Sequence, residues 1–412
     1  MTVRRRPSAP DAVSLACVIG LAVGAFRAGD CLAVQRGAVV RDSAGIRIVE
    51  NRDPRWPPGA GWRIGTEPSL AIGTALGDEP YLFQRIVAAR RLGGGAVVVA
   101  ESGAGELRFF DRDGVFLHAA GGAGEGPGEF RFLSAAWTWS DTIAAYDNAL
   151  LRLSVFAPDG GLVGTHSFRP AEGAGRPAAQ MRFEDGTLLV LSAPSGMVPT
   201  GRGLLEGAAW RLDRYARDGT FLGEIAPLRE STRWGHDISG LPPMYLPLSL
   251  GLGLFASAGN AVYAGDGVEP SIRRLENDGT VTDLIRWPAP ERRVTEGDKS
   301  RYRTANATPP PAFHPDAWSR YLREVPFPAA MPTYSRLVVD AGGGLWARRF
   351  TAPGEESSAW YVFAEDGVWL GEVDMPRGVR VLEIGADYVL GVRVEHLGVA
   401  SVVTFPLHRD DP

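Results

Sequence analysis

Short apolar segments with alternating polar residues run along most of this chain, and small turns separate them. Five times such a segment ends in an aromatic residue or leucine, followed by two variable residues and Asp-Gly. The five phrases end at Asp113-Gly114, Asp159-Gly160, Asp218-Gly219, Asp278-Gly279 and Asp366-Gly367. Alternation with a period of two predicts β-strands, and Asp-Gly between two strands predicts a hairpin. We expect the aromatic residue or leucine to end the incoming strand on a buried face.

A second set of hairpins lies between these phrases. Each member is an apolar segment, a small turn and another apolar segment. The six members are Ile86 to Ala100, Ala135 to Tyr146, Met181 to Leu191, Leu254 to Ala264, Leu337 to Ala347 and Val379 to Val392. Five of them are followed by an Asp-Gly hairpin, which gives a repeating unit of four strands. This repeat predicts an all-β fold, a six-bladed β-propeller over residues 45–412.

The sixth unit is one strand short, because only the segment from Ala400 to Leu407 follows its hairpin. The alternating run from Gly45 to Glu50 is an unassigned strand at the other end of the propeller region. Pairing this N-terminal strand with the last blade would close the ring and remove two exposed sheet edges. We therefore predict a propeller closed by the N-terminal strand.

The longest interval between Asp-Gly phrases contains an insertion of about residues 288–332, between blades four and five. Thr295 and Asp298 have the spacing of a capping box, which predicts one short helix. Trp318, Tyr321, Leu322 and Val325 follow helical spacing and predict a second. A smaller irregular segment, Arg229 to Leu250, contains Trp234 and His236. We expect a short helical cap on one face, with both irregular segments near the same end of the central channel.

Residues 97–130 carry a family resemblance. The strand Val97 to Glu101, the Asp113-Gly114 turn and the phrase Gly126-Pro127-Gly128-Glu129-Phe130 together resemble an NHL repeat. More loosely, residues 45–407 resemble the exported bacterial propellers grouped with TolB-like proteins. The resemblance implies a six-bladed propeller. It does not imply one function, because propellers include enzymes, ligand-binding proteins and scaffolds.

Charge and composition narrow the range of partners. The chain has 43 basic and 48 acidic residues and a formal charge of −5 at pH 7. The basic residues are spread along the sequence, without a stripe of lysine or arginine, so we do not expect nucleic acid as a partner. We predict a monomer that binds a protein or a small polar ligand.

The N-terminus has the pattern of a signal peptide, which we assign to residues 1–25. Arg4, Arg5 and Arg6 precede an apolar stretch from Ala12 to Phe26. This stretch is shorter than the roughly 20 apolar residues that a membrane-spanning helix needs. Residues 26–44 are interpreted as a linker. We predict an exported protein, periplasmic or extracellular, without an integral membrane span and without a lipid anchor at Cys31, because Asp30 interrupts the small apolar run that lipoprotein signals use.

Acidic residues recur where the second strand of a blade ends. Propellers of the gluconolactonase and arylesterase type, which this plan resembles, hold calcium or a similar divalent ion with such side chains, and oxygen ligands suit a hard cation. The resemblance implies as possible ligands Glu101, Asp147, Asn148, Asp266 and Glu395. The alternative is that each acid braces a loop by accepting backbone N–H groups. The cofactor is therefore either none or a divalent ion, and no metal ligand is assigned.

Arginine interrupts this acidic series at Arg348 or Arg349, and Ser192 interrupts it in blade three. A mixed ring of arginine and carboxylate suits a polar or anionic ligand better than a bare cation. His236 beside Asp237 and near Trp234 is the one histidine placed for general-base work, with a solvated loop histidine as the alternative.

The sequence therefore favours an exported propeller that binds a ligand or protein partner at one face without catalysis. The alternative is a divalent-metal-dependent hydrolase of lactones or esters, with its site at the central channel. No catalytic residue is assigned.

Overall fold

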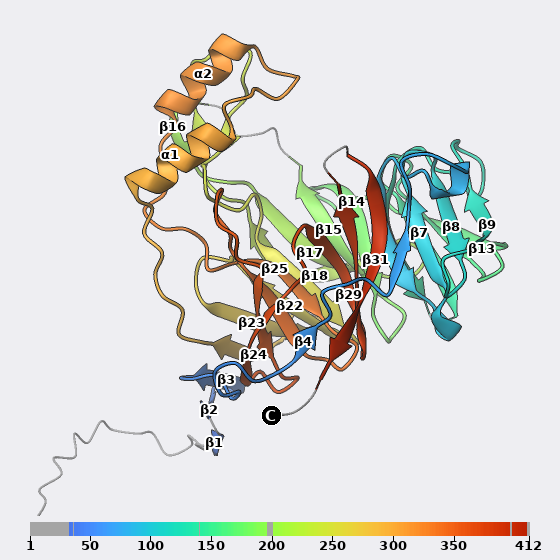
Figure 1. The fold of residues 1–412 in the computed structure, drawn as a ribbon, viewed down its shortest axis with the longest axis horizontal. Helices are drawn as coiled ribbons and strands as arrows, with labels where there is room; N and C mark the ends of the chain where they lie inside the picture. The colour runs from blue at the N-terminus through green and yellow to red at the C-terminus, as the bar shows by residue number, and fades with distance from the viewer. Residues whose placement is uncertain (1–32, 36, 140, 196–200, 396–397, 410–412) are drawn as a thin grey trace, which may run out of the picture.

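The computed structural model describes residues 33–35, 37–139, 141–195, 201–395 and 398–409. The described chain is mostly β, as the alternating pattern predicts (Figure 1). The proposed signal peptide at 1–25 and Cys31 lie outside the described residues.

Six of the described sheets contain four or more strands. The first consists of β6 (Ile86–Arg91), β7 (Val97–Glu101), β8 (Glu106–Phe110) and β9 (Phe116–Gly121). The second consists of β10 (Leu133–Trp139), β11 (Thr142–Asp147), β12 (Arg152–Phe156) and β13 (Leu162–Ser167). The third consists of β14 (Ala174–Arg182), β15 (Leu188–Pro194), β17 (Ala209–Tyr215) and β18 (Phe221–Arg229).

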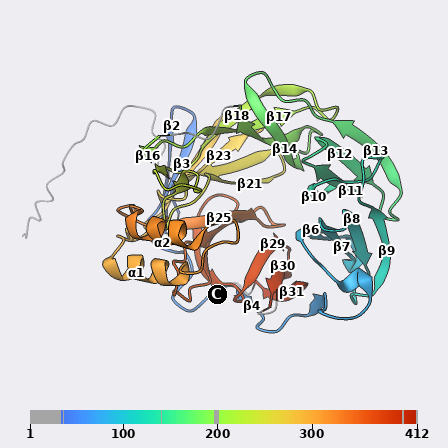
Figure 2. The same cartoon turned by 90° about the horizontal axis from the view of Figure 1, so that it is seen from above.

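The last three sheets follow in chain order. The fourth contains β21 (Leu254–Ala258), β22 (Ala261–Gly265), β23 (Ser271–Glu276) and β24 (Val281–Arg286). The fifth contains β25 (Tyr334–Val339), β26 (Leu345–Arg349), β27 (Ala359–Phe363) and β28 (Trp369–Asp374). The sixth contains β29 (Val379–Ile384), β30 (Tyr388–Val394) and β31 (Ala400–His408). Figure 2 shows these sheets one after another around a common axis, with β6, β10, β14, β21, β25 and β29 on the inner side.

The Asp-Gly phrases form the turns between the third and fourth strands of the first five sheets. Gly114, between β8 and β9, has φ of +82°, a conformation that glycine adopts without steric cost. A register shift follows, between the pairs that Phe109 and Phe110 make with β9. Phe110 is completely buried, as are its counterparts Tyr215 and Phe363. Both the turns and the buried strand ends are therefore as the sequence predicts.

The N-terminal strand does not pair where we expected. β3 (Ile46–Asn51), which contains most of the predicted run Gly45 to Glu50, pairs in parallel with β24 of the fourth sheet and not with the last sheet. The Asn51 side chain fixes this position, since its Nδ2 donates to Arg286 O at 2.9 Å and its Oδ1 accepts from Trp369 N at 2.8 Å. An alternating pattern predicts a strand but does not specify its partner.

The sequence preceding β3 also forms strands. β1 (Ala33–Gln35) pairs with β2 (Ala38–Ser43), and β2 pairs with β3, so part of the segment interpreted as a linker extends the fourth sheet to seven strands.

Two very short strands occupy the outer edge of the last sheet instead. β5 (Leu70–Ile72) pairs antiparallel with the middle of β31, and β4 (Arg63–Ile64) pairs with the end of β31. Between β3 and β4, Trp56 packs against Trp346 and Trp360 in the core between the fifth and sixth sheets. The segment from β3 to β5 therefore contacts the fourth, fifth and sixth sheets.

The two irregular segments form one module beside the larger sheets. The insertion contains α1 (Glu296–Ala305) and α2 (Pro315–Glu324), and Thr295 and Asp298 form the predicted capping box. The other segment contributes β19 (Arg233–Gly235) and β20 (Met244–Tyr245), which form a three-stranded sheet with β16 (Gly203–Leu205). The buried face of α2 packs on this sheet and its loops (Figure 1). None of the helices within the described ranges is long and apolar enough to cross a membrane.

Candidate functional site

The acids at the ends of second strands lie at one end of their sheets, and those that are buried brace loops. Glu101 is buried, with Oε1 accepting from Arg85 N at 2.6 Å and Oε2 accepting from Ala104 N at 2.6 Å. Asp147 is fully buried, and its two oxygens accept four backbone N–H groups, those of residues 131, 132, 149 and 150. These carboxylates have little capacity left for a metal ion.

The other predicted ligands are separate from one another. Asp266 is exposed, and its Oδ1 accepts from Val268 N at 2.8 Å and from Glu269 N at 3.0 Å. Glu395 is exposed as well, whereas Asn148 is partly buried and its Oδ1 has no hydrogen-bond partner. Within the described part of the chain, no group of three or more His, Cys, Asp or Glu side chains could hold a metal ion. Asp266 therefore braces a loop by accepting backbone N–H groups, as Glu101 and Asp147 do.

Trp234 and His236 come together, but inside the helical module. Their ring centroids are 4.9 Å apart, and Tyr321 of α2 lies 5.7 Å from Trp234 and 5.9 Å from His236. His236 Nδ1 accepts from Ile238 N at 3.2 Å, and burial lowers the pKa of this histidine. Asp237 instead forms ion pairs with Arg202 and Arg320. This arrangement joins β19 to α2, and two arginines engage the Asp237 carboxylate beside His236.

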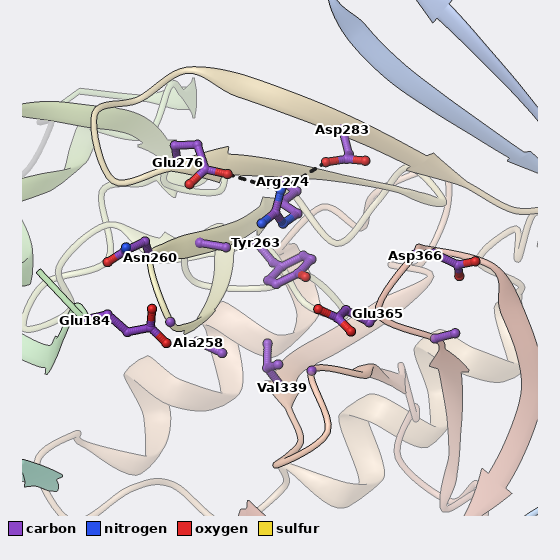
Figure 3. Close-up of a pocket in the computed structure, with 14 residues that line it drawn as sticks. Glu184, Ala258, Asn260, Tyr263, Arg274, Glu276, Asp283, Val339, Glu365 and Asp366 are labelled. Atoms are coloured by element: carbon purple, nitrogen blue, oxygen red, sulfur yellow. Dashed lines mark hydrogen bonds and ion pairs between the residues drawn. The ribbon is translucent and has the colours of Figure 1, made fainter. Parts of the chain in front are cut away.

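A cavity of about 890 Å³ lies between the fourth and fifth sheets (Figure 3). The turns at Gly259 and Gly343 line it, and these turns precede second strands, whereas the loop braces follow second strands. Five carboxylates and one guanidinium line the cavity. Three of them come from turns and three from strands β23 and β24, and the charged residues are Glu184, Arg274, Glu276, Asp283, Glu365 and Asp366. A cavity with this excess of negative charge is suited to a ligand that carries positive charge.

Arg274 neutralises only one side of the cavity. Its Nη1 lies 3.2 Å from Glu276 and 3.3 Å from Asp283, and both contacts are drawn in Figure 3. Asp283 also contacts Arg47 of β3 at 2.9 Å, so the N-terminal strand supports this wall. Tyr263 forms the floor, and burial raises its pKa, which keeps the phenol protonated.

Glu184 and Glu365 are the carboxylates that remain available. In Figure 3 they lie on either side of Tyr263, and they come from turns of the third and fifth sheets. Both are exposed, and neither side chain forms a hydrogen bond or ion pair with any residue that the structure describes. The sequence analysis missed them. The available signal was an acid directly before the turn aspartate in Glu184-Asp185 and Glu365-Asp366.

Comparisons with known proteins give no family. No protein-family model matches the chain, and no curated protein matches it. Among solved structures, it is similar to a Bacteroides fragilis protein described as exported, at 12% identity and a TM-score of 0.49, over 88% of this chain and 100% of that one.

Two enzymes are among the other similar structures. A virginiamycin B lyase from Staphylococcus aureus with quinupristin gives 10% identity and a TM-score of 0.38, over 83% of this chain and 99% of that one. A PQQ-bound aldose sugar dehydrogenase from Streptomyces coelicolor gives 13% identity and a TM-score of 0.43, over 85% of this chain and 100% of that one. Both enzymes have β-propeller folds.

Proposed function

We propose that this protein is an exported six-bladed β-propeller that binds a positively charged ligand, without catalysis, in the acidic cavity between its fourth and fifth sheets. The observation that carries the proposal is the cavity itself, with five carboxylates around a single arginine. The ligand is a small polyamine or the basic side chains of a protein partner.

The proposed architecture rests on the repeated hairpins. Each of the six larger sheets begins with an inner strand, and β5 supplies an outer strand to the last one. We propose that this pairing closes the ring in place of the strand Gly45 to Glu50. The phrase Gly126 to Phe130 supports kinship with NHL-repeat or TolB-like propellers, and Arg4 to Phe26 supports export.

We propose binding rather than hydrolysis because the carboxylates that hydrolysis would need already have hydrogen-bond partners, whereas two carboxylates of the acidic cavity have none among the described residues. Glu101 and Asp147, which the hydrolase alternative needs as ion ligands, accept backbone N–H groups. Glu184 and Glu365 are not engaged, and they are far apart in sequence but line one cavity. An exposed carboxylate without an internal partner can bind a cation at a lower free-energy cost than one that must first break internal hydrogen bonds.

The proposal is tested by calorimetric titration of the protein with spermidine and, separately, with a lysine octapeptide. The double variant Glu184→Gln with Glu365→Gln should weaken binding of one or both probes by about tenfold or more, because each lost charge contact contributes about 1 kcal/mol. The control is Glu67→Gln with Glu172→Gln, two exposed acids outside the cavity. It has the same net charge and should bind like the wild type.

Spermidine binding alone would identify a small amine as the ligand class, and peptide binding alone would identify a basic protein segment. Equal weakening by the two double variants would show that only net charge matters, and it would overturn the proposal. Absence of binding by both probes would overturn it as well.

A further inference from the structure

Four arginines lie on strands of the first, fifth and sixth sheets that neighbour one another near the axis. Arg90 lies on β6, Arg336 on β25 and Arg380 on β29, and Figure 2 shows these three strands along the inner side of the ring. Arg348 lies on β26, directly opposite Arg336 in the strand register. The four positions come from the first, fifth and sixth sheets.

The cluster is electrostatically unfavourable by itself. Opposite positions on neighbouring strands place Arg336 and Arg348 on the same face of the sheet, where like charges are destabilising. Burial, and then the guanidinium groups of Arg380, Arg348 and Arg90, lower the pKa of Arg336 to about 10. A repulsion of this kind is relieved when an anion binds between the groups.

Internal partners satisfy only part of the cluster. Arg90 donates to Leu382 O at 3.2 Å and lies 3.9 Å from Glu383, and Arg380 donates to Ile86 O at 2.7 Å. Across the described ranges, Arg336 and Arg348 have neither a hydrogen-bond acceptor nor a carboxylate at ion-pair distance. Their guanidinium N–H donors are therefore free for a ligand.

A second cavity reaches this cluster. Arg348 lines a space of about 300 Å³ between the fifth and sixth sheets, together with Ser357, Ser358 and Arg377. Glu355 and Glu356 line it too, and Glu355 is paired with Arg292. Arg377 already pairs with Glu356 at 2.9 Å. The cavity lies where β26 ends and β29 begins, whereas the acidic cavity includes Gly343 in the turn at the other end of β25 and β26. The two sites are therefore at opposite ends of the same hairpin.

We propose that Arg336 and Arg348, supported by Arg380 and Arg90, form a binding site for a compact polyanion that carries phosphate or carboxylate groups. The planar guanidinium presents paired N–H donors that match the oxygen pairs of both groups. Ser357 and Ser358 at the cavity add hydroxyl groups for neutral ligand atoms. The inference is independent of the proposed amine site.

The test measures the melting temperature with pyrophosphate, with citrate and with sodium chloride at matched ionic strength. Pyrophosphate or citrate at saturation should raise the melting temperature by about 3 °C or more above the chloride reference, through binding to the native state. Arg336→Gln and Arg348→Gln should each remove most of that increase. Without an added polyanion, Arg336→Gln should melt at the same temperature as the wild type or higher, because it relieves repulsion.

The control is Arg112→Gln, which removes an arginine that is 77% exposed in the turn after β8. It should leave the polyanion effect unchanged. A larger effect of pyrophosphate supports a phosphorylated ligand, and a larger effect of citrate supports a polycarboxylate. An equal increase in the wild type and in both site variants, or no increase over chloride with either anion, would overturn the inference. A lower melting temperature for Arg336→Gln in the anion-free buffer would show a structural role instead.

Discussion

At the scale of single residues, the surroundings of a carboxylate decide its role. Asp147 is fully buried and accepts four backbone N–H groups, so it stabilises the segment before β10 and the loop after β11. Glu365 is exposed in a turn and has no partner among the residues that the structure describes. The first carboxylate is a structural element, and the second is available to a ligand.

Asp147→Ala should lower the free energy of unfolding by about 3 kcal/mol or more, because it leaves buried N–H groups without an acceptor. Urea unfolding followed by tryptophan fluorescence measures this. Asp141→Ala, an exposed acid in the turn before β11, should change the value by less than about 0.5 kcal/mol. Addition of a chelator should leave the wild type unchanged. A chelator that reproduces the loss seen in Asp147→Ala would instead identify Asp147 as a metal ligand.

Residue types alone could not separate these roles. The sequence analysis placed Glu101 and Asp147 correctly at strand ends and gave loop bracing as one alternative, but only the hydrogen bonds decide between the two. Of the four arginines, the sequence analysis named only Arg348, with Arg349 as its alternative. Arg90, Arg336 and Arg380 are spread over almost the whole chain, and an arginine within an alternating strand has the pattern of any solvent-facing residue.

At the scale of elements, the strand β3 joins two sheets. It pairs with β24 along its length, and the Asn51 side chain at its end also reaches the fifth sheet, donating to Gly367 O at 3.1 Å and accepting from Trp369 N at 2.8 Å. Arg47 on the same strand contacts Asp283 of the fourth sheet and Asp366 O of the fifth. β3 is therefore a lateral link between neighbouring sheets.

Asn51→Ala should lower the free energy of unfolding by about 2 kcal/mol, because it removes three hydrogen bonds from a buried amide. The measurement is chemical denaturation of the purified protein. Asn277→Ala, which removes one amide hydrogen bond at an exposed turn, is the matched control and should cost less than about 1 kcal/mol. Similar losses in the two variants would contradict a linking role for Asn51.

In the helical module, several hydrogen bonds converge on the Glu230 side chain. Glu230 accepts from Ala208 N at 2.9 Å and from Arg233 at 2.6 Å, and the Tyr245 hydroxyl also donates to it. Burial raises the pKa of Glu230, but the hydrogen bonds from Arg233 and Tyr245 outweigh it and hold the pKa below its usual value. The same environment raises the pKa of Tyr245 to about 12.

The lowered pKa of Glu230 predicts that the free energy of unfolding depends on pH. A carboxyl group whose pKa is lowered by folding stabilises the protein above its unfolded pKa of about 4.3, and the stabilisation is lost as the pH falls through the folded value. Glu230→Gln should therefore be less stable than the wild type at pH 7, and the difference should shrink towards pH 3. Urea unfolding at both pH values measures it. A difference that is independent of pH would mean that Glu230 contributes through packing.

Elements were predicted best where their pattern was long. The hairpins, the capping box at Thr295 and the buried face of α2 follow from spacing that extends over many residues. β4 and β5 have two and three residues, too few to show alternation, so their pairing with β31 could not be predicted. Because β5 was missed, the outer edge of the last sheet was assigned to the strand Gly45 to Glu50.

At the scale of the whole molecule, the pairing of β5 with β31 joins residues 70–72 to residues 402–404, which are far apart in the sequence. Gly73 follows β5 with φ of +129°, and a side chain there would lie 2.6 Å from Ala400 O. The close approach allows β5 to sit against β31. If this pairing closes the ring, weakening it should affect every sheet and not the last one alone.

Gly73→Ala should lower the melting temperature by several degrees, through the clash and the unfavourable φ. Tryptophan fluorescence and far-ultraviolet circular dichroism should shift together, because the sheets unfold as one unit. The control is Gly59→Ala, which also has a positive φ but open space around the added carbon, so its effect should be smaller. Separate transitions for the two signals would show that the sheets do not unfold as one unit, and that the pairing of β5 with β31 does not couple them.

The same pairing has a consequence for the order of synthesis. Ser69 Oγ donates to Thr404 O, a contact between residues 335 positions apart. The ribosome makes β5 before β31, so β5 has no strand partner in the sixth sheet until residues 402–404 have been synthesised. Contacts this distant in sequence form slowly, because a long loop must close first. Completion of the sixth sheet therefore has to follow synthesis of β31, however early the other sheets fold.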